Sequence, residues 1–90
     1  MPWAVEFDPA AAKELRRLDP QVAARILAFL RDRLAPLDDP RSIGEALRGD
    51  APGQYWKYRP GDFRIIGRIV DRRVLIVVVR IGHRREVYRG

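Results

Sequence analysis

Residues 74–79 read VLIVVV, six apolar side chains in succession. A strand with one face in solvent alternates apolar and polar residues, whereas this run is apolar at every position. It is therefore typical of a central strand that is covered on both faces. The run is also much shorter than the ~20 residues that a membrane-spanning helix needs. It predicts the central strand of a sheet rather than a membrane span.

Other stretches have the composition or the alternation of strands. These are residues 3–7 (WAVEF), 54–59 (QYWKYR) and 63–70 (FRIIGRIV), with the central strand extending over 73–81 (RVLIVVVRI). Pro60-Gly61 and Asp71-Arg72 mark the turns between the last three strands. The C-terminal half therefore predicts a three-stranded antiparallel meander.

Two Asp-Pro pairs predict where helices begin. Asp8-Pro9 and Asp19-Pro20 each offer an N-cap residue followed by proline at the first helical position. The first helix presents an apolar face, and in the second the apolar residues recur at helical spacing from Val22 to Leu34. Residues 38–53 are expected to form a connector with one short helical turn. The predicted fold is α+β: an N-terminal strand, a helical hairpin, then the meander, with the helices packed on one sheet face.

Composition limits the kinds of function. The 90 residues include no cysteine and one histidine, so we expect neither a disulfide framework nor a His- or Cys-rich metal site, and no cofactor. The N-terminus has no signal-peptide pattern, and a cytoplasmic protein is expected. Residues 1–45 carry 7 basic and 8 acidic side chains, a net charge of −1, whereas residues 46–90 carry 11 and 4, a net charge of +7. This asymmetry favours a surface that binds a polyanion, with nucleic acid as the leading candidate.

The first hairpin of the meander separates its charges from its apolar residues. Alternation places Trp56 and Tyr58 on the core face of their strand, and Lys57 on the other face with Tyr55 and Arg59. A four-residue loop, RPGD at 59–62, is expected to set Lys57 directly opposite Arg64 on the next strand. Directly opposed cations destabilise a sheet unless an anion lies between them, although both side chains could instead splay into solvent. The pair therefore predicts a phosphate site.

Several motifs together resemble the RelE family of toxins from toxin–antitoxin systems. They are LRG at 47–49, YWKYRPGDFRII at 55–66 and VLIVVVRIGHRREVYR at 74–89. The strand followed by GHRREVY is the most specific part, and the resemblance covers essentially the whole chain. It implies a single RelE-like toxin domain over residues 1–90. It also implies a cytoplasmic toxin with a RelB-like antitoxin as partner and no membrane association.

RelE-like toxins cut mRNA in the A site of the 30S ribosomal subunit without a metal ion. The 2′-OH attacks the adjacent phosphate and leaves a 2′,3′-cyclic phosphate and a 5′-OH end. By this resemblance the catalytic residues are Lys57 and Arg64 on the strands and Arg84 and Tyr88 in the tail, with His83 as a further candidate. A second lysine of the family pattern is replaced here by Tyr55, which leaves the identity of the general base open between Lys57, His83 and Tyr88.

The reaction itself requires these residue types. Negative charge accumulates at phosphorus in the transition state, and fixed guanidinium groups stabilise it. A lysine or tyrosine among other cations can transfer a proton near neutral pH. The remaining side chains predicted to bind RNA are Tyr55, Arg48, Arg59, Arg80, Arg85 and Arg89. The register of Arg80, which faces either the site or the rim of the sheet, stays open.

Other functions remain compatible with this sequence. A ParE-like toxin would act on gyrase without cutting RNA, and a nucleic-acid-binding module would have no catalysis. A toxin that has lost activity is a further alternative because of Tyr55. Four clustered side chains, Lys57, Arg64, Arg84 and Tyr88, would favour the nuclease, because a toxin that binds only protein needs no phosphate site.

Overall fold

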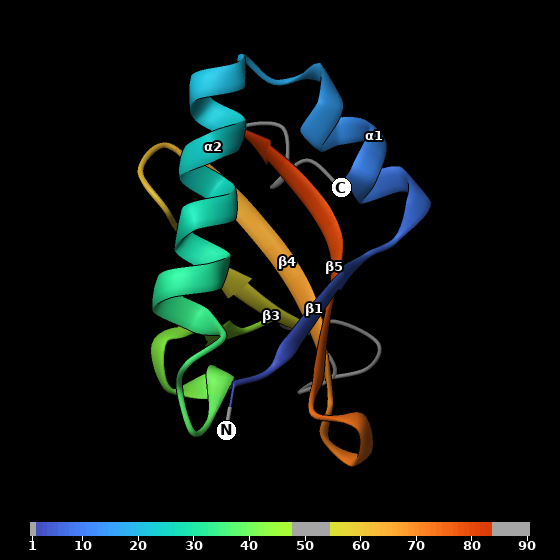
Figure 1. The fold of residues 1–90 in the computed structure, drawn as a ribbon, viewed down its shortest axis with the longest axis vertical. Helices are drawn as coiled ribbons and strands as arrows, with labels where there is room; N and C mark the ends of the chain where they lie inside the picture. Colours follow the sequence, from blue (N-terminus) through green and yellow to red (C-terminus); the bar gives the residue numbers. More distant parts are fainter. Residues whose placement is uncertain (1, 48–54, 84–90) are drawn as a thin grey trace.

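The computed structural model describes residues 2–47 and 55–83. Figure 1 shows two helices beside a twisted sheet. In chain order the elements are β1 (Ala4–Phe7), α1 (Pro9–Arg17), α2 (Pro20–Ala28), η1 (Phe29–Leu34), η2 (Pro40–Ile43), β2 (Glu45–Ala46), β3 (Tyr55–Tyr58), β4 (Phe63–Val70), η3 (Asp71–Arg73) and β5 (Leu75–His83). The predicted order of strand, two helices and meander is confirmed. The two-residue strand β2 was not predicted.

The sheet has five strands in the order β1-β5-β4-β3-β2. β1 runs parallel to β5, with Ala4 opposite Leu75 and Phe7 opposite Val78. The other neighbours are antiparallel. The apolar run in β5 therefore has a strand on each side, and Leu75–Val78 are all buried. The prediction of a central strand is confirmed.

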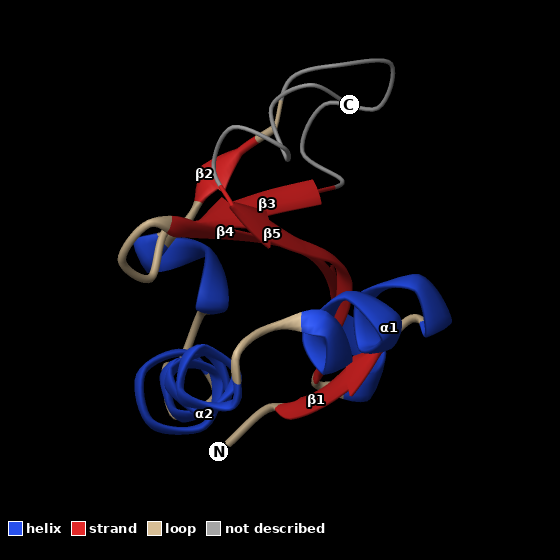
Figure 2. Cartoon of the chain, turned by 90° about the horizontal axis from the view of Figure 1, so that it is seen from above, coloured by secondary structure: helices blue, strands red, loops and turns tan. Residues whose placement is uncertain are grey.

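Both helices cover the same face of the sheet (Figure 2). The Asp19 carboxylate accepts a hydrogen bond of 2.9 Å from the Gln21 N–H and so caps α2. Asp8 has the extended backbone of an N-cap without a side-chain cap bond. A π-helical segment, η1, continues α2, and the buried stripe from Ile26 through Leu34 faces the sheet. The core unites Ala11, Ile26, Leu30 and Leu34 of the helices with Tyr58, Ile65, Ile76, Val78 and Ile81 of the strands.

Two turns and one bulge shape the meander. Gly61 has φ +63° in the turn between β3 and β4, where glycine avoids the steric cost of a side chain. Val74 has φ +49° after η3, which connects β4 and β5. The pairing of Ile66 with Arg80 is followed by that of Gly67 with Val78, so Val79 is an extra residue in β5. In the described part of the chain, no helix is long and apolar enough to cross a membrane.

Candidate functional site

The face of the sheet opposite α1 and α2, called here the site face, carries a row of paired side chains. Across the strands, Glu45 of β2 pairs with Lys57 of β3, Lys57 with Ile66 of β4, and Ile66 with Arg80 of β5. Paired residues point to the same face, and this row alternates with the buried Tyr58, Ile65 and Ile81. The row therefore includes Lys57 and the strand position of Arg80, whose side chain turns to the rim of the sheet.

The predicted pairing of the first hairpin is wrong by two residues. Lys57 lies opposite Ile66, and Tyr58 lies opposite Ile65, whereas Arg64 pairs with Gly82 of β5. The loop does span residues 59–62, as predicted. Within it the Phe63 N–H donates to the Pro60 carbonyl oxygen and closes a turn. The first residue of β4 that pairs with β3 is therefore Ile65, two residues after β4 begins. A shift of two keeps every side chain on its face. Arg64 is consequently a diagonal neighbour of Lys57 rather than its direct partner.

Arg64 is a buried cation, with 7% of its surface exposed. Its Nη1 donates to the carbonyl oxygen of Phe63 at 2.9 Å and to that of Gly61 at 3.5 Å. Burying a charge is costly unless hydrogen bonds compensate it. These turn carbonyls fix the guanidinium in place, so its orientation is set before any ligand arrives.

Lys57 belongs to an ion-pair cluster at the edge of the sheet. Its Nζ lies 3.6 Å from Glu45 Oε2, and 11% of its side chain is exposed. Arg59 Nη2 pairs with the other oxygen of the same carboxylate. Sequence reasoning missed Glu45, because a two-residue strand is too short to show alternation. The structure thus holds an anion between two of the predicted site cations.

Tyr58 anchors the strand that carries Lys57. Its hydroxyl donates to the Pro40 carbonyl oxygen at 2.8 Å, and burial raises the pKa of Tyr58 to about 12. Gly44 passes close over the ring: a Cβ at position 44 would lie 2.8 Å from Tyr58 Cε1. This close approach brings the chain into β2 and so positions Glu45 against Lys57.

Arg80 reaches the rim of the sheet. The bulge at Val79 puts its backbone in register with Ile66 on the site face. Its Nε lies 3.7 Å from Glu14 Oε2 in α1, and 41% of its side chain is exposed. Glu14 Oε1 also accepts from the Ile81 N–H at 2.9 Å, beyond the last pairing of β1 with β5. Glu14 is a second residue that sequence reasoning missed, because its contact depends on how α1 packs.

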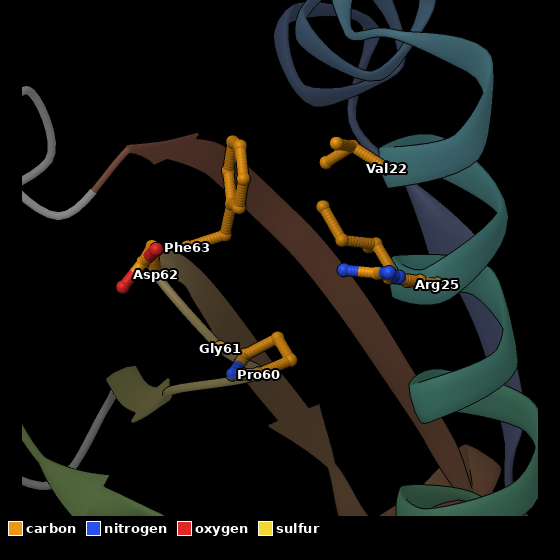
Figure 3. Close-up of a pocket in the computed structure, with 7 residues that line it drawn as sticks. Val22, Arg25, Pro60, Gly61, Asp62 and Phe63 are labelled. Atoms are coloured by element: carbon orange, nitrogen blue, oxygen red, sulfur yellow. The ribbon is translucent and has the colours of Figure 1, made fainter.

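His83 is directed toward the opposite face. It pairs with Phe63, and the two rings meet edge to face with centroids 5.8 Å apart. Figure 3 shows Phe63 and the turn from Pro60 facing α2 across a cavity of about 240 Å³. Phe63 also packs against the helix-side core. The structure therefore does not bring His83 together with Lys57 and Arg64.

Tyr55 is half-buried on the site face, opposite the exposed Arg68. The other predicted site residues, Arg48, Arg84, Arg85, Tyr88 and Arg89, lie outside the described residues. Within residues 2–47 and 55–83, no three His, Cys, Asp or Glu side chains gather as a metal site would require. The described site is thus a set of cations, one tyrosine and a carboxylate.

Comparisons with known proteins identify the family. Residues 5–88 match the family described as the ParE toxin of the type II toxin–antitoxin system, parDE. The chain is 32% identical to Toxin RelG of Mycobacterium tuberculosis over 89 residues, which cover 99% of each chain. It is 30% identical to the mRNA interferase toxin RelE of Escherichia coli, covering 98% of this chain and 92% of the relative.

Solved structures give the same result. The crystal structure of the toxin–antitoxin complex RelBE2 from Mycobacterium tuberculosis matches with a TM-score of 0.83 and 28% identity, covering 93% of each chain. A variant of the Escherichia coli toxin RelE in the free state matches with a TM-score of 0.75 and 28% identity, covering 99% of this chain and 93% of that one. The resemblance in sequence and fold is confirmed, and the chain belongs to the RelE-like toxins of type II toxin–antitoxin systems, in the RelE/ParE superfamily.

Proposed function

We propose that this toxin is a ribosome-dependent endoribonuclease that cuts mRNA in the 30S A site. The observation that carries the proposal is the arrangement of cations on the site face. Lys57 of β3 and the buried Arg64 of β4 share this face, and hydrogen bonds to turn carbonyls fix Arg64. Fixed cations of this kind stabilise the charge that develops on a phosphate in the transition state.

In the proposed reaction the 2′-OH of one nucleotide loses its proton and attacks the adjacent phosphorus. The P–O5′ bond breaks, leaving a 2′,3′-cyclic phosphate and a 5′-OH end once the leaving oxygen has gained a proton. Arg64 stabilises the phosphate oxygens. By resemblance to RelE, Arg84 shares this role, and Tyr88 or Lys57 takes the proton from the 2′-OH. His83 receives no proton-transfer role, because its pairing with Phe63 directs it to the helix side.

The proposal extends to partners and cell compartment. Several similar solved structures are complexes of RelE with RelB, and a RelB-like antitoxin is the proposed inhibitor of this chain. Residues 1–90 are proposed to act as one toxin domain in the cytoplasm, where ribosomes and mRNA are available.

A translation extract with a defined mRNA tests the activity. Wild type should produce new RNA ends at ribosome-positioned codons, mapped by primer extension, and Arg64→Ala should not. Arg72→Ala is the matched control, because Arg72 is an exposed arginine of η3, in the turn at the other end of β4. Cleavage by Arg64→Ala at the wild-type rate, with the protein folded, would refute the assigned role of Arg64.

A second function is favoured by the family description, which names ParE toxins. A ParE-like toxin would leave the mRNA intact and inhibit gyrase instead. A DNA supercoiling assay with purified gyrase, run beside the extract, separates the two. Inhibition of supercoiling without RNA cleavage would replace the nuclease proposal.

A further inference from the structure

A cavity of about 300 Å³ opens beside β3, on the edge of the sheet where β2 pairs with it. Its walls come from η1, the last residue of η2, the edge strand β2 and its neighbour β3 with the residue that follows it. The lining residues are Phe29, Arg33, Ile43, Glu45, Lys57 and Arg59. Its volume lies at the lower end of the range for small-molecule sites, ~300–1,000 Å³. The cavity thus has room for one small group.

The charges of this lining favour an anion. Three cations and one carboxylate give the lining a formal charge of +2. The Glu45 carboxylate already contacts Lys57 and Arg59, so it marks a position where an anion is held. Arg33 is exposed and takes part in none of the ion pairs between described residues. Since 53% of the Glu45 side chain is exposed, it has room to turn aside for a competing anion.

The remaining two residues form an apolar wall. Ile43 is 47% exposed, one of the few large apolar side chains that solvent reaches in the described chain. Phe29 packs against Tyr58 on its inner side, with ring centroids 6.3 Å apart, and borders the cavity as well. An apolar wall beside several cations suits a ligand with a flat apolar ring and a phosphate. A nucleotide has both.

We propose that this cavity binds one nucleotide of single-stranded RNA, with its base against Ile43 and Phe29 and its phosphate on Arg33 and Arg59. Lys57 lines the cavity and also lies on the site face, so the bound nucleotide is a neighbour of the one that is cut. The inference rests on the proposed function and deepens it by assigning a second nucleotide position. Arg33 and Ile43 then become RNA-binding residues that are separate from the catalytic set.

Direct binding tests this assignment without requiring cleavage. The probe is a fluorescent single-stranded RNA hexamer with 2′-O-methyl riboses, which cannot be cut because no 2′-OH is free to attack. Fluorescence anisotropy gives the Kd for wild type, Arg33→Glu and the charge-matched control Arg72→Glu. We expect Arg33→Glu to weaken binding about tenfold or more through loss of a charged phosphate contact, and Arg72→Glu to weaken it several-fold less.

A second comparison examines the apolar wall. Ile43→Ser should weaken binding of the hexamer about fivefold or more, the low end of what base stacking contributes. It should leave the affinity for an otherwise identical abasic probe unchanged. Arg33 and Ile43 are both exposed, so circular dichroism should show that the variants keep the wild-type fold. Arg33→Lys keeps the positive charge and should therefore retain most of the affinity for the hexamer.

Each outcome decides the assignment. Equal weakening by Arg33→Glu and Arg72→Glu would overturn it, because the effect would then come from general charge. Equal affinity of Ile43→Ser and wild type for the hexamer would also overturn it. Binding of a fluorescent Glu-rich peptide that Arg33→Glu weakens more than Arg72→Glu does, with no measurable binding of the RNA hexamer, would assign the cavity to a protein ligand instead. The two proposals can also fail separately. If Arg33→Glu selectively loses binding of the hexamer but wild type cuts no mRNA in the translation extract, the RNA-binding cavity is supported and the nuclease is refuted.

Discussion

The two faces of the sheet are built by the same strands but serve different purposes. On the helix-covered face, Tyr58, Ile65 and Ile81 are each about 1% exposed and belong to the core. Their immediate sequence neighbours Lys57 and Arg64 lie on the site face, and Arg80 starts in the same row but reaches the rim of the sheet near Glu14 of α1. A single alternation therefore encodes both stability and the candidate chemistry. Substitutions one residue apart should separate the two properties.

The largest expected effect is on the covered face. Ile65→Ala removes buried methyl and methylene groups from the centre of the core and leaves a cavity. We expect a loss of about 2–5 kcal/mol in the free energy of unfolding. Urea denaturation followed by circular dichroism measures it. A loss below about 1 kcal/mol would mean that this position can repack, and that the covered face is less tightly specified than its burial indicates.

Its neighbour should show the reverse pattern. In the translation extract, Arg64→Ala should lower the cleavage rate about 100- to 1,000-fold, the effect of removing one preorganised donor to a transition-state oxyanion. Ile65→Ala, assayed at a temperature where it is still folded, should retain most of its cleavage rate. Loss of activity by both variants while both remain folded would contradict the separation of the faces.

Alternation predicted which face each residue occupies but not the pairing between strands. Side chains in a strand alternate with period two, so Tyr58 and Lys57 were assigned correctly to opposite faces. The exact partner of Lys57 depends on the turn, and the turn shifted Arg64 by two residues from the predicted position. A two-residue shift in strand pairing leaves every side chain on the same face, so the alternation of apolar and polar residues cannot reveal it. This is why the fold was predictable while the direct Lys57–Arg64 opposition was wrong.

The residues that sequence reasoning missed depend on contacts between distant segments. Glu45 meets Lys57 only because Gly44 passes over the Tyr58 ring. Glu14 meets the Ile81 N–H only because β5 continues past the end of β1 and α1 packs against it there. Neither contact leaves a local pattern. The side of Arg80, left open by the sequence, was set by one extra residue in the strand.

Tyr58 makes a smaller contribution to the free energy of unfolding than Ile65, and this contribution depends on pH. The reason is that its hydroxyl is a polar, titratable group on the covered face of the sheet. Its pKa is raised to about 12 in the folded protein, above the ordinary value of 10.0, by burial. The protonated form is thus favoured by folding. That stability is fully present below pH 10 and is lost as the pH rises toward 12, by about 2–3 kcal/mol.

Tyr58→Phe tests this. At neutral pH it should cost about 1–2 kcal/mol, because the Pro40 carbonyl oxygen loses its donor. Between pH 10 and 12 the variant should lose less stability than wild type, so the two unfolding curves should converge. Parallel curves across this range would show that the hydroxyl ionises equally in folded and unfolded chains.

The smallest effect is expected at an ion pair outside both faces. Arg41 donates to both carboxylate oxygens of Asp71, at 2.7 and 3.2 Å, and links η2 to η3. This hydrogen bonding lowers the pKa of Asp71 below its ordinary value of 3.8. Because the folded pKa is the lower one, the contribution is present above the unfolded pKa and disappears as the pH falls through the folded pKa.

Asp71→Asn should therefore be slightly less stable than wild type at neutral pH and equal to it at the acid end. The effect is small because 66% of the Asp71 side chain is exposed and solvent screens the pair. Asp38→Asn is the matched control, since Asp38 is exposed and appears in no ion pair between described residues. Thermal unfolding from pH 2 to 7 compares the three proteins. If Asp71→Asn and Asp38→Asn give the same curve, the ion pair between Arg41 and Asp71 adds nothing to the stability of the folded protein. The free energy of unfolding would then depend on the covered face of the sheet and not on this surface ion pair.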